Sequence, residues 1–235
     1  EGKDFLVWRE NYLEGPLLKN VSLEDFEKLN IFSAQRIPYV ENGFYLEYED
    51  KIGNHPYHHA GMIYMQDPGA MAALCAIDSI PDDAWVLDTC SAPGGKSSQI
   101  AAKIPRGFLL ANEYVPKRAK TVVSNFERLG IRNAIVTSLD TAELPKMMRA
   151  AFDLVICDAP CSGEGMFRKS EEALEDWSVE NVLTCAKRQR EILENLPELV
   201  KGGGYLLYST CTYSIEENEL VVDAFLTAHP EFSLV

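Results

Sequence analysis

The chain has 235 residues, of which 46% are hydrophobic and 25% are charged, and this balance is typical of a soluble globular protein. The length is sufficient for one large α/β domain with or without a small appendage. The composition excludes a disordered or collagen-like chain, and the apolar runs are far shorter than the ~20 residues of a membrane span. A formal net charge of −14 argues, taken alone, against a nucleic-acid partner, because contacts with phosphates require clustered Lys and Arg.

The first part of the chain, to about residue 54, is irregular. Gly and Pro interrupt it repeatedly, and only residues 23–29 have the spacing of a short helix. We expect a small appendage of loops and short strands over residues 1–60, followed by the main domain over residues 61–235. At the start of that domain, residues 69–80 carry apolar side chains at helical spacing and precede Pro81.

From Trp85 onward, short apolar runs alternate with helical segments. The predicted strands are residues 85–87, 108–111, 134–136, 152–157 and 205–208. The predicted helices between them are residues 96–103, 116–129, 143–148 and 179–200. Strands that alternate with helices predict βαβ units and a mostly parallel sheet, so the expected fold class is α/β.

Two further elements are predicted near the end of the sequence. The run SIEE at residues 214–217 has the S-x-x-E form of a capping box, which predicts a helix that continues to about Thr227. The apolar fragment at residues 232–235 predicts a final strand.

The six cysteines do not have the pattern of a disulfide framework. Cys90, Cys157 and Cys211 lie in or at the ends of apolar, strand-like runs, and Cys75 and Cys185 lie in helical patterns. A chain with a core of this size does not depend on disulfides. We therefore expect reduced thiols and a cytoplasmic protein.

The first motif with chemical meaning is LDTCSAPGGKS at residues 87–97, where an apolar strand enters a Gly-rich turn and then a helix. Glycines let the backbone approach a ligand closely, and a helix N-terminus offers unpaired N–H groups. The motif is not a P-loop, because Cys90 stands where the first Gly would be, and the G-x-G-x-x-G fingerprint is absent. A purely structural strand-to-helix turn is the alternative for this motif alone.

Acidic residues stand at successive strand ends. Glu113 closes the second strand, 25 residues after Asp88, at the place where doubly wound folds put an acid that binds ribose hydroxyls. Asp140 ends the third strand. Each acid alone would more often be a solvated loop residue, but ligands gather outside the carboxyl ends of parallel strands. The three acids together therefore predict a nucleoside site.

Two cysteines fall on the same rim of the predicted sheet. The segment DAPC at residues 158–161 follows the fourth strand, and STCT at residues 209–212 follows the fifth. A structural cysteine is expected within a strand, as Cys157 is, rather than just past its end. We expect no metal site, because the chain has no C-x-x-C pair and its histidines at residues 55–59 are remote in sequence from both thiols.

These segments, with EENE at residues 216–219, resemble those of the RNA cytosine-5 methyltransferases of the Sun (Fmu) type. The resemblance covers residues 64–235, and DAPCSGEGMFRK at residues 158–169 is similar to the RsmF-like branch, which acts on small-subunit ribosomal RNA. The resemblance implies a Rossmann-like methyltransferase domain that uses S-adenosylmethionine. We expect the family's last antiparallel strand, and any C-terminal RNA-binding domain, to lie outside this sequence.

The implied reaction proceeds through a covalent adduct. Cytosine C5 is a poor nucleophile, and a thiolate that adds to C6 turns C5 into an enamine-like carbon that can accept a methyl group. By the resemblance, Cys211 is the nucleophile and Cys161 aids product release. The implied cofactor site comprises Cys90, Ser91, Ala92, Pro93, Gly94, Gly95, Lys96, Glu113, Asp140 and Asp158, and Asp158 also faces the cytosine.

The sequence thus predicts a monomeric, metal-free RNA (cytosine-5) methyltransferase, with 16S ribosomal RNA as the favoured substrate and no membrane partner. Methylation of tRNA is the first alternative. A non-catalytic RNA-binding assembly factor is the second, and the two intact thiol motifs argue against it. An amino-group methyltransferase would carry Asn/Asp-Pro-Pro-aromatic where this chain has DAPC. Local basic clusters at residues 168–169 and 187–190, and the N-terminal appendage, are the expected RNA contacts.

Overall fold

The fold is built around a five-stranded parallel sheet, with the order β7-β6-β5-β8-β9. The computed structural model describes residues 5–8, 35–40, 42–45, 52–77, 79–167 and 171–235. The strands of the sheet are β5 (Trp85–Asp88), β6 (Phe108–Asn112), β7 (Ala134–Thr137), β8 (Phe152–Asp158) and β9 (Val200–Ser209). All five predicted strands are present, and the α/β class is confirmed.

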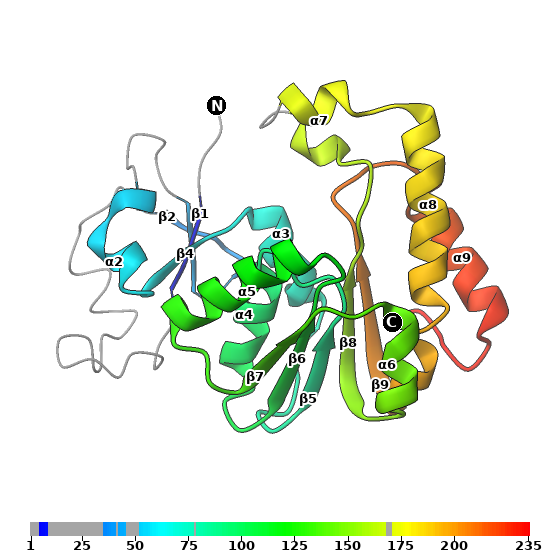
Figure 1. Cartoon of the computed structure of the whole chain (residues 1–235), viewed down its shortest axis with the longest axis horizontal. Coiled ribbons are helices and arrows are strands. Elements are labelled where there is room, and N and C mark those ends of the chain that lie inside the picture. The colour runs from blue at the N-terminus through cyan, green and yellow to red at the C-terminus, as the bar shows by residue number, and fades with distance from the viewer. Residues whose placement is uncertain (1–4, 9–34, 41, 46–51, 78, 168–170) are drawn as a thin grey trace.

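Helices cover both faces of this sheet, as Figure 1 shows. One face carries α4 (Gly95–Lys103) and α5 (Pro116–Leu129), and the other carries α6 (Leu144–Met147), α8 (Val179–Leu193) and α9 (Glu219–Ala228). Neighbouring strand residues alternate between the two cores: Leu109 packs with α4 and α5, and Leu110 packs with α8. Both faces are buried, which explains why the strands are continuous apolar runs. No helix in the described ranges is both long enough and apolar enough to cross a membrane.

The strand order places a topological switch point at β5. The chain runs outward from β5 to β6 and β7, then returns to β8 and β9 on the other side of β5. The loops that follow β5 and β8 therefore leave the sheet in opposite directions. In open α/β sheets, ligands bind in the crevice outside the strand ends at such a point.

A small antiparallel sheet, of order β2-β3-β1-β4, precedes the large one. Its strands are β1 (Phe5–Trp8), β2 (Gln35–Arg36), β3 (Gly43–Tyr45) and β4 (Ile63–Met65), and the short helices around it are η1 (Ile52–Asn54), α2 (Pro56–His59), α3 (Pro68–Ala72) and η2 (Ala73–Ala76). Because β4 pairs with β1, this sheet extends past residue 60, and a domain boundary there remains a prediction. Arg128 of α5 joins the two sheets, donating to His58 O at 2.6 Å and to Ile63 O at 3.0 Å.

Three of the predicted helices are shorter than expected, and the one predicted over residues 143–148 covers only Leu144–Met147. The helix predicted over residues 179–200 ends at Leu193, because Pro197 has no N–H for the carbonyl of Leu193 and its ring would clash with that carbonyl. A short helical turn, η5 (Pro197–Leu199), follows, and Val200 already begins β9. The helix predicted over residues 69–80 is two short pieces, α3 and η2. The helix predicted over residues 23–29 lies outside the described residues.

Of the two elements predicted at the end of the chain, the helix is present but begins later than predicted, and the strand is wrong. Ser214 does not cap a helix: its hydroxyl donates to Glu216, and α9 begins only at Glu219. The last predicted strand is absent from the described residues 232–235. The Phe232 ring instead packs against Phe225 of α9, with the ring centroids 5.3 Å apart. The apolar side chain of Phe232, which suggested a strand, is thus partly buried against α9 instead.

The rest of the chain contributes short local elements. These are η3 (Thr141–Glu143) after β7, and η4 (Glu164–Met166) and α7 (Glu171–Glu175) between β8 and α8. All six cysteines lie among the described residues, and all are free thiols there.

Candidate active site

A cavity of about 950 Å³ lies at the carboxyl ends of the parallel strands. Of the residues predicted for the site, Cys90, Ala92, Glu113, Asp140, Asp158, Cys161 and Cys211 line it. Ser91, Pro93, Gly94, Gly95 and Lys96 lie in the adjoining turn and the start of α4 rather than in the cavity wall. The topology therefore brings both thiols and the strand-end acids to one place.

The turn after β5 is fixed by the buried side chain of Asp88. Its carboxylate accepts from the Ser97 hydroxyl at 2.5 Å and from Cys90 N at 3.4 Å. Burial raises the pKa of Asp88 to about 6, against the lowering effect of the Ser97 hydrogen bond. Gly94 has φ +108°, a left-handed conformation that favours glycine. The buried Asp88 carboxylate thus fixes the turn through these hydrogen bonds, but it is not part of the cavity wall.

Glu113 presents a buried carboxylate to the cavity. Its side chain is 4% exposed, its Oε1 accepts from Val115 N at 3.0 Å, and its Oε2 lies 3.6 Å from Arg118 Nη1. The preceding residue, Asn112, binds Thr137 and Leu139 through its side-chain amide, so the end of β6 is tied to the end of β7. The carboxylate is therefore held in one orientation and keeps acceptor capacity for a polar ligand.

The two thiols meet at the other side of the cavity. Cys161 Sγ and Cys211 Sγ are 3.2 Å apart, although 50 residues separate them in the chain. Cys211 N donates to Cys161 Sγ at 3.4 Å, and Gly165 N donates to Cys211 O at 2.8 Å. A side chain at Gly165 would come within 2.7 Å of that carbonyl oxygen, so the close approach of the two loops requires glycine.

A half-buried ion pair adjoins the thiols. Lys96 Nζ lies 2.6 Å from Asp158 Oδ2, and Ser209 Oγ donates to Asp158 Oδ1 at 2.8 Å. The Lys96 side chain is 10% exposed and the Asp158 side chain is 34% exposed, so only the ammonium is largely shielded from solvent. These bonds fix the Asp158 carboxylate at the cavity wall.

The thiols have opposite pKa shifts. The hydrogen bond from Cys161 lowers the pKa of the Cys211 thiol to about 7, with help from the Lys96 ammonium and against burial and the Asp158 carboxylate. The same hydrogen bond and burial raise the pKa of Cys161 far above its ordinary value. Because only the thiolate is nucleophilic, the geometry favours Cys211 as the nucleophile and Cys161 as a protonated donor beside it.

The pKa of Cys211 can be measured by its alkylation. We expect the rate of Cys211 alkylation by iodoacetamide, followed by peptide mass spectrometry, to rise about tenfold per pH unit and to level off above about pH 7. In Lys96→Met the inflection should move to higher pH, because loss of the ammonium disfavours the thiolate. Lys103→Met, at the exposed end of α4, is the matched control. The same inflection in both variants would show that Lys96 does not act on the thiol.

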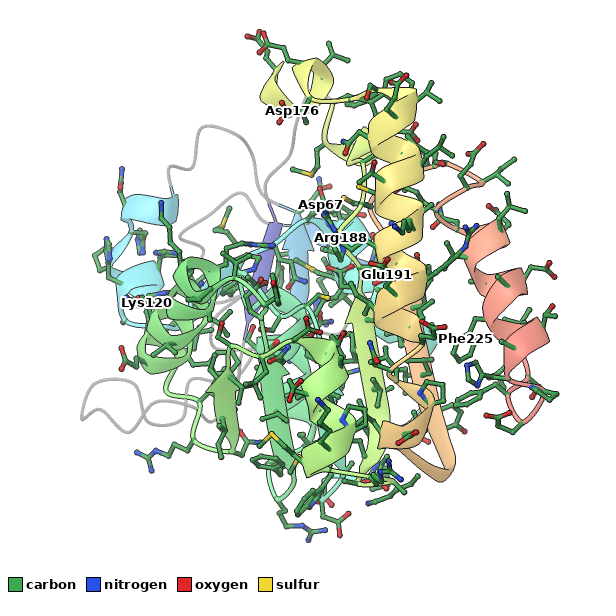
Figure 2. All side chains as sticks on the ribbon, turned by 45° about the vertical axis from the view of Figure 1, so that its right-hand side comes forward. Asp67, Lys120, Asp176, Arg188, Glu191 and Phe225 are labelled. Atoms are coloured by element: carbon green, nitrogen blue, oxygen red, sulfur yellow. The ribbon has the colours of Figure 1, made fainter. Side chains whose placement is uncertain are left out.

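The helix α8 supplies cavity residues that the sequence analysis missed. Arg188, Glu191 and Ile192 of α8, and Asn195 just after it, line the cavity, and Figure 2 shows Arg188 and Glu191 on the side of α8 that faces the sheet. The sequence marked residues 187–190 only as a basic cluster. The spacing of Arg188, Glu191 and Ile192 defines one face of a helix, but no local signal says that this face lies over the strand ends.

His55 and His58 take part in hydrogen bonds within and around α2. His55 Nδ1 accepts from Tyr57 N at 3.2 Å, as the N-cap of α2. Burial lowers the pKa of His58, whose carbonyl oxygen accepts from Arg128. Among the described residues, no group of three or more His, Cys, Asp or Glu side chains could hold a metal ion.

Comparison with known families matches both parts of the chain. Residues 76–235 match the family described as "16S rRNA methyltransferase RsmB/F", and residues 18–68 match the "N-terminal domain of 16S rRNA methyltransferase RsmF". The chain belongs to the RsmB/F methyltransferase family. The resemblance to the Sun (Fmu) type is thereby confirmed.

The RsmB/F assignment agrees with individual relatives. Ribosomal RNA small subunit methyltransferase F of Vibrio parahaemolyticus is 39% identical over 210 residues, which are 86% of this chain and 44% of that protein. The enzyme of the same name from Citrobacter koseri is 37% identical over 242 residues, which are 97% of this chain and 50% of that protein. The chain thus spans about half the length of the curated relatives it matches.

Solved structures confirm the Rossmann-like methyltransferase fold. A methyltransferase homologue from Pyrococcus horikoshii is 29% identical, with a TM-score of 0.77, and the match covers 96% of this chain and 70% of that one. The NSun6 structure from the same organism has a TM-score of 0.79 at 18% identity, and the match covers 96% of this chain and 80% of that one. At that identity the second match supports the fold alone.

Proposed function

We propose that the protein methylates C5 of cytosine in RNA, with S-adenosylmethionine as methyl donor and 16S ribosomal RNA as substrate. The observation that carries this proposal is the thiol pair, in which Cys211 and Cys161 lie 3.2 Å apart with opposite pKa shifts at the wall of a large cavity. Cytosine C5 methylation needs one thiolate to attack C6 and a second group to assist release. Membership of the RsmB/F family supports the same reaction.

The cavity fits the proposed cofactor. Glu113 offers a buried carboxylate for the two ribose hydroxyls, and Asp140 lies on the adjoining loop beside it. The turn after β5, which contains Ala92, forms part of the cavity wall at the strand ends. When bound, the cofactor supplies a methyl group carried on a sulfonium sulfur. A volume of about 950 Å³ leaves room for a nucleoside and a target base together.

The residues of the chain then act in sequence on the base. The Cys211 thiolate forms a bond to C6, and Asp158, held by Lys96 and Ser209, hydrogen-bonds to the polar edge of the cytosine. C5 accepts the methyl group and afterwards loses its proton to water, and the electron pair left at C5 restores the C5–C6 double bond. The bond between C6 and the Cys211 sulfur finally breaks, and the Cys161 thiol, already a hydrogen-bond partner of that sulfur, stabilises the departing thiolate.

The substrate is a structured RNA in this proposal, and the protein is a cytoplasmic monomer. Arg188 supplies positive charge on the wall of the cavity that also holds the thiols, which supports an RNA partner despite the net charge of −14. The N-terminal sheet is the second candidate RNA contact. Methylation of tRNA is the alternative that shares the same site chemistry.

The proposal is tested by methyl transfer to isolated RNAs. We expect label from the methyl donor to enter 16S ribosomal RNA, and nucleoside mass spectrometry to identify 5-methylcytidine. Label in tRNA alone would establish the alternative substrate. A methyl group on the exocyclic nitrogen, or RNA binding without any transfer, would overturn the proposed reaction.

A further inference from the structure

The carboxylate of Glu217 is buried in the domain and serves the loop that carries Cys161. Glu217 is 0% exposed, and its Oε2 accepts from Ser162 N at 3.0 Å and from Gln189 Nε2 at 2.8 Å. Gln189, on α8, also donates to Pro160 O at 3.0 Å. The residues on both sides of Cys161 are therefore held, directly or through Gln189, by one carboxylate.

The next residue, Asn218, serves the loop that carries Cys211. Its Oδ1 accepts from Thr210 Oγ1 at 2.7 Å, and its Nδ2 donates to Thr212 O at 3.2 Å and to Ser214 O at 2.8 Å. Thr210 and Thr212 are the immediate neighbours of Cys211. The side-chain amide of Asn218 thus holds both sides of that thiol.

Further hydrogen bonds join the two cysteine loops to each other and join β9 to Glu217. Ser162 Oγ and Thr212 Oγ1 are 3.0 Å apart, and the Tyr208 hydroxyl donates to Glu217 O at 2.7 Å. Burying a carboxylate costs free energy unless hydrogen bonds compensate for the lost hydration. Here the compensating donors come from the Cys161 loop and α8, so the burial of Glu217 depends on the placement of that loop.

We propose that Glu217 and Asn218 are positioning residues, which set the two thiols at hydrogen-bonding distance: Glu217 orients Cys161, and Asn218 orients Cys211. This inference rests on the proposed function of the two thiols. It assigns a distinct step to each residue, because Cys161 is proposed to act in release and Cys211 in attack. Neither residue touches the substrate in this account.

The test compares Glu217→Gln with Glu216→Gln. The second variant makes the same change at an exposed neighbouring carboxylate, whose side chain accepts from Ser214 Oγ. In Glu217→Gln the loss of charge weakens both bonds to Oε2, so kcat should fall roughly tenfold to a hundredfold, with KM for S-adenosylmethionine unchanged. The covalent protein–RNA adduct should accumulate, and the alkylation inflection of Cys211 should move to higher pH. Glu216→Gln should behave as wild type.

The second variant, Asn218→Ala, separates the two roles. Adduct formation should slow roughly tenfold, and no adduct should accumulate, because attack by Cys211 becomes limiting. Asn218 is only half buried, so this variant keeps the inference testable if Glu217→Gln does not fold.

Three outcomes would overturn the inference. The first is wild-type turnover and a wild-type alkylation profile in folded Glu217→Gln. The second is a loss explained entirely by a lower melting temperature and weaker cofactor binding. The third is wild-type adduct formation in Asn218→Ala. Failure of the proposed function itself would look different, since the wild-type protein would then transfer no methyl group to C5 of cytosine, or Cys211→Ala would keep wild-type activity.

Discussion

Replacement of Cys211 by Ala should abolish methyl transfer without trapping RNA, whereas replacement of Cys161 by Ala should leave a covalent protein–RNA adduct. Without the Cys211 sulfur no bond to C6 can form. Without the Cys161 thiol the attack still occurs, but turnover should fall roughly 10²–10⁴-fold, which is the usual contribution of a positioned proton donor. The adduct should survive denaturing electrophoresis and carry label from the methyl donor.

The control for this experiment is Cys75→Ala, which removes an exposed thiol of η2 that does not line the cavity. It should have wild-type activity and trap no RNA. If Cys211→Ala traps RNA and Cys161→Ala does not, the roles of the two thiols are reversed. The pKa shifts argue against that reversal, because the lowered pKa belongs to Cys211.

Replacement of Glu113 by Ala should weaken S-adenosylmethionine binding roughly tenfold to a hundredfold. Hydrogen bonds to charged groups contribute about 1.5–3 kcal/mol, and each 1.4 kcal/mol corresponds to about tenfold in affinity. Glu113→Gln should lose less, because its amide oxygen still accepts one bond. The matched control is Glu143→Ala, which removes an exposed carboxylate of η3 that pairs with Lys146 of α6. Calorimetric titration that shows unchanged affinity for Glu113→Ala would remove Glu113 from the cofactor site.

The sequence predicts those elements whose signals are local. The helix α5 has the predicted bounds, residues 116–129, because Pro116 occupies its first turn and Gly130 ends it with φ +66°. The strand-end acids were predicted for a related reason. Parallel strands bring their carboxyl ends to one edge, so the chain order of Glu113 and Asp140 is enough to place both there.

Signals that depend on distant partners were missed or misinterpreted. Glu217 fits the local S-x-x-E pattern, yet its carboxylate binds Ser162 and Gln189, which are 55 and 28 residues away in the chain. Tertiary hydrogen bonds therefore override the capping box. The contribution of α8 to the cavity has the same origin, since the rotation of that helix is set by its packing against β8 and α9.

The distance between the sulfur atoms of the two thiols could not be predicted from the sequence. Both cysteines were placed on one rim, but no sequence pattern gives the 3.2 Å contact between Cys161 and Cys211. The hydrogen bond between the two sulfurs lowers the pKa of Cys211 and raises that of Cys161. The difference in pKa therefore follows from the structure, whereas the resemblance to the family had supplied only the assignment of roles.

The most direct measurement maps the adduct formed with RNA that contains 5-fluorocytidine. Fluorine at C5 cannot leave as the proton does, so the enzyme stalls with the base attached to its attacking sulfur. Trypsin places the two thiols in different peptides, residues 150–168 for Cys161 and the peptide that begins at residue 202 for Cys211. We predict that mass spectrometry will find the modified nucleotide on the peptide that begins at residue 202, at Cys211. Its attachment to the peptide of residues 150–168 would contradict the account.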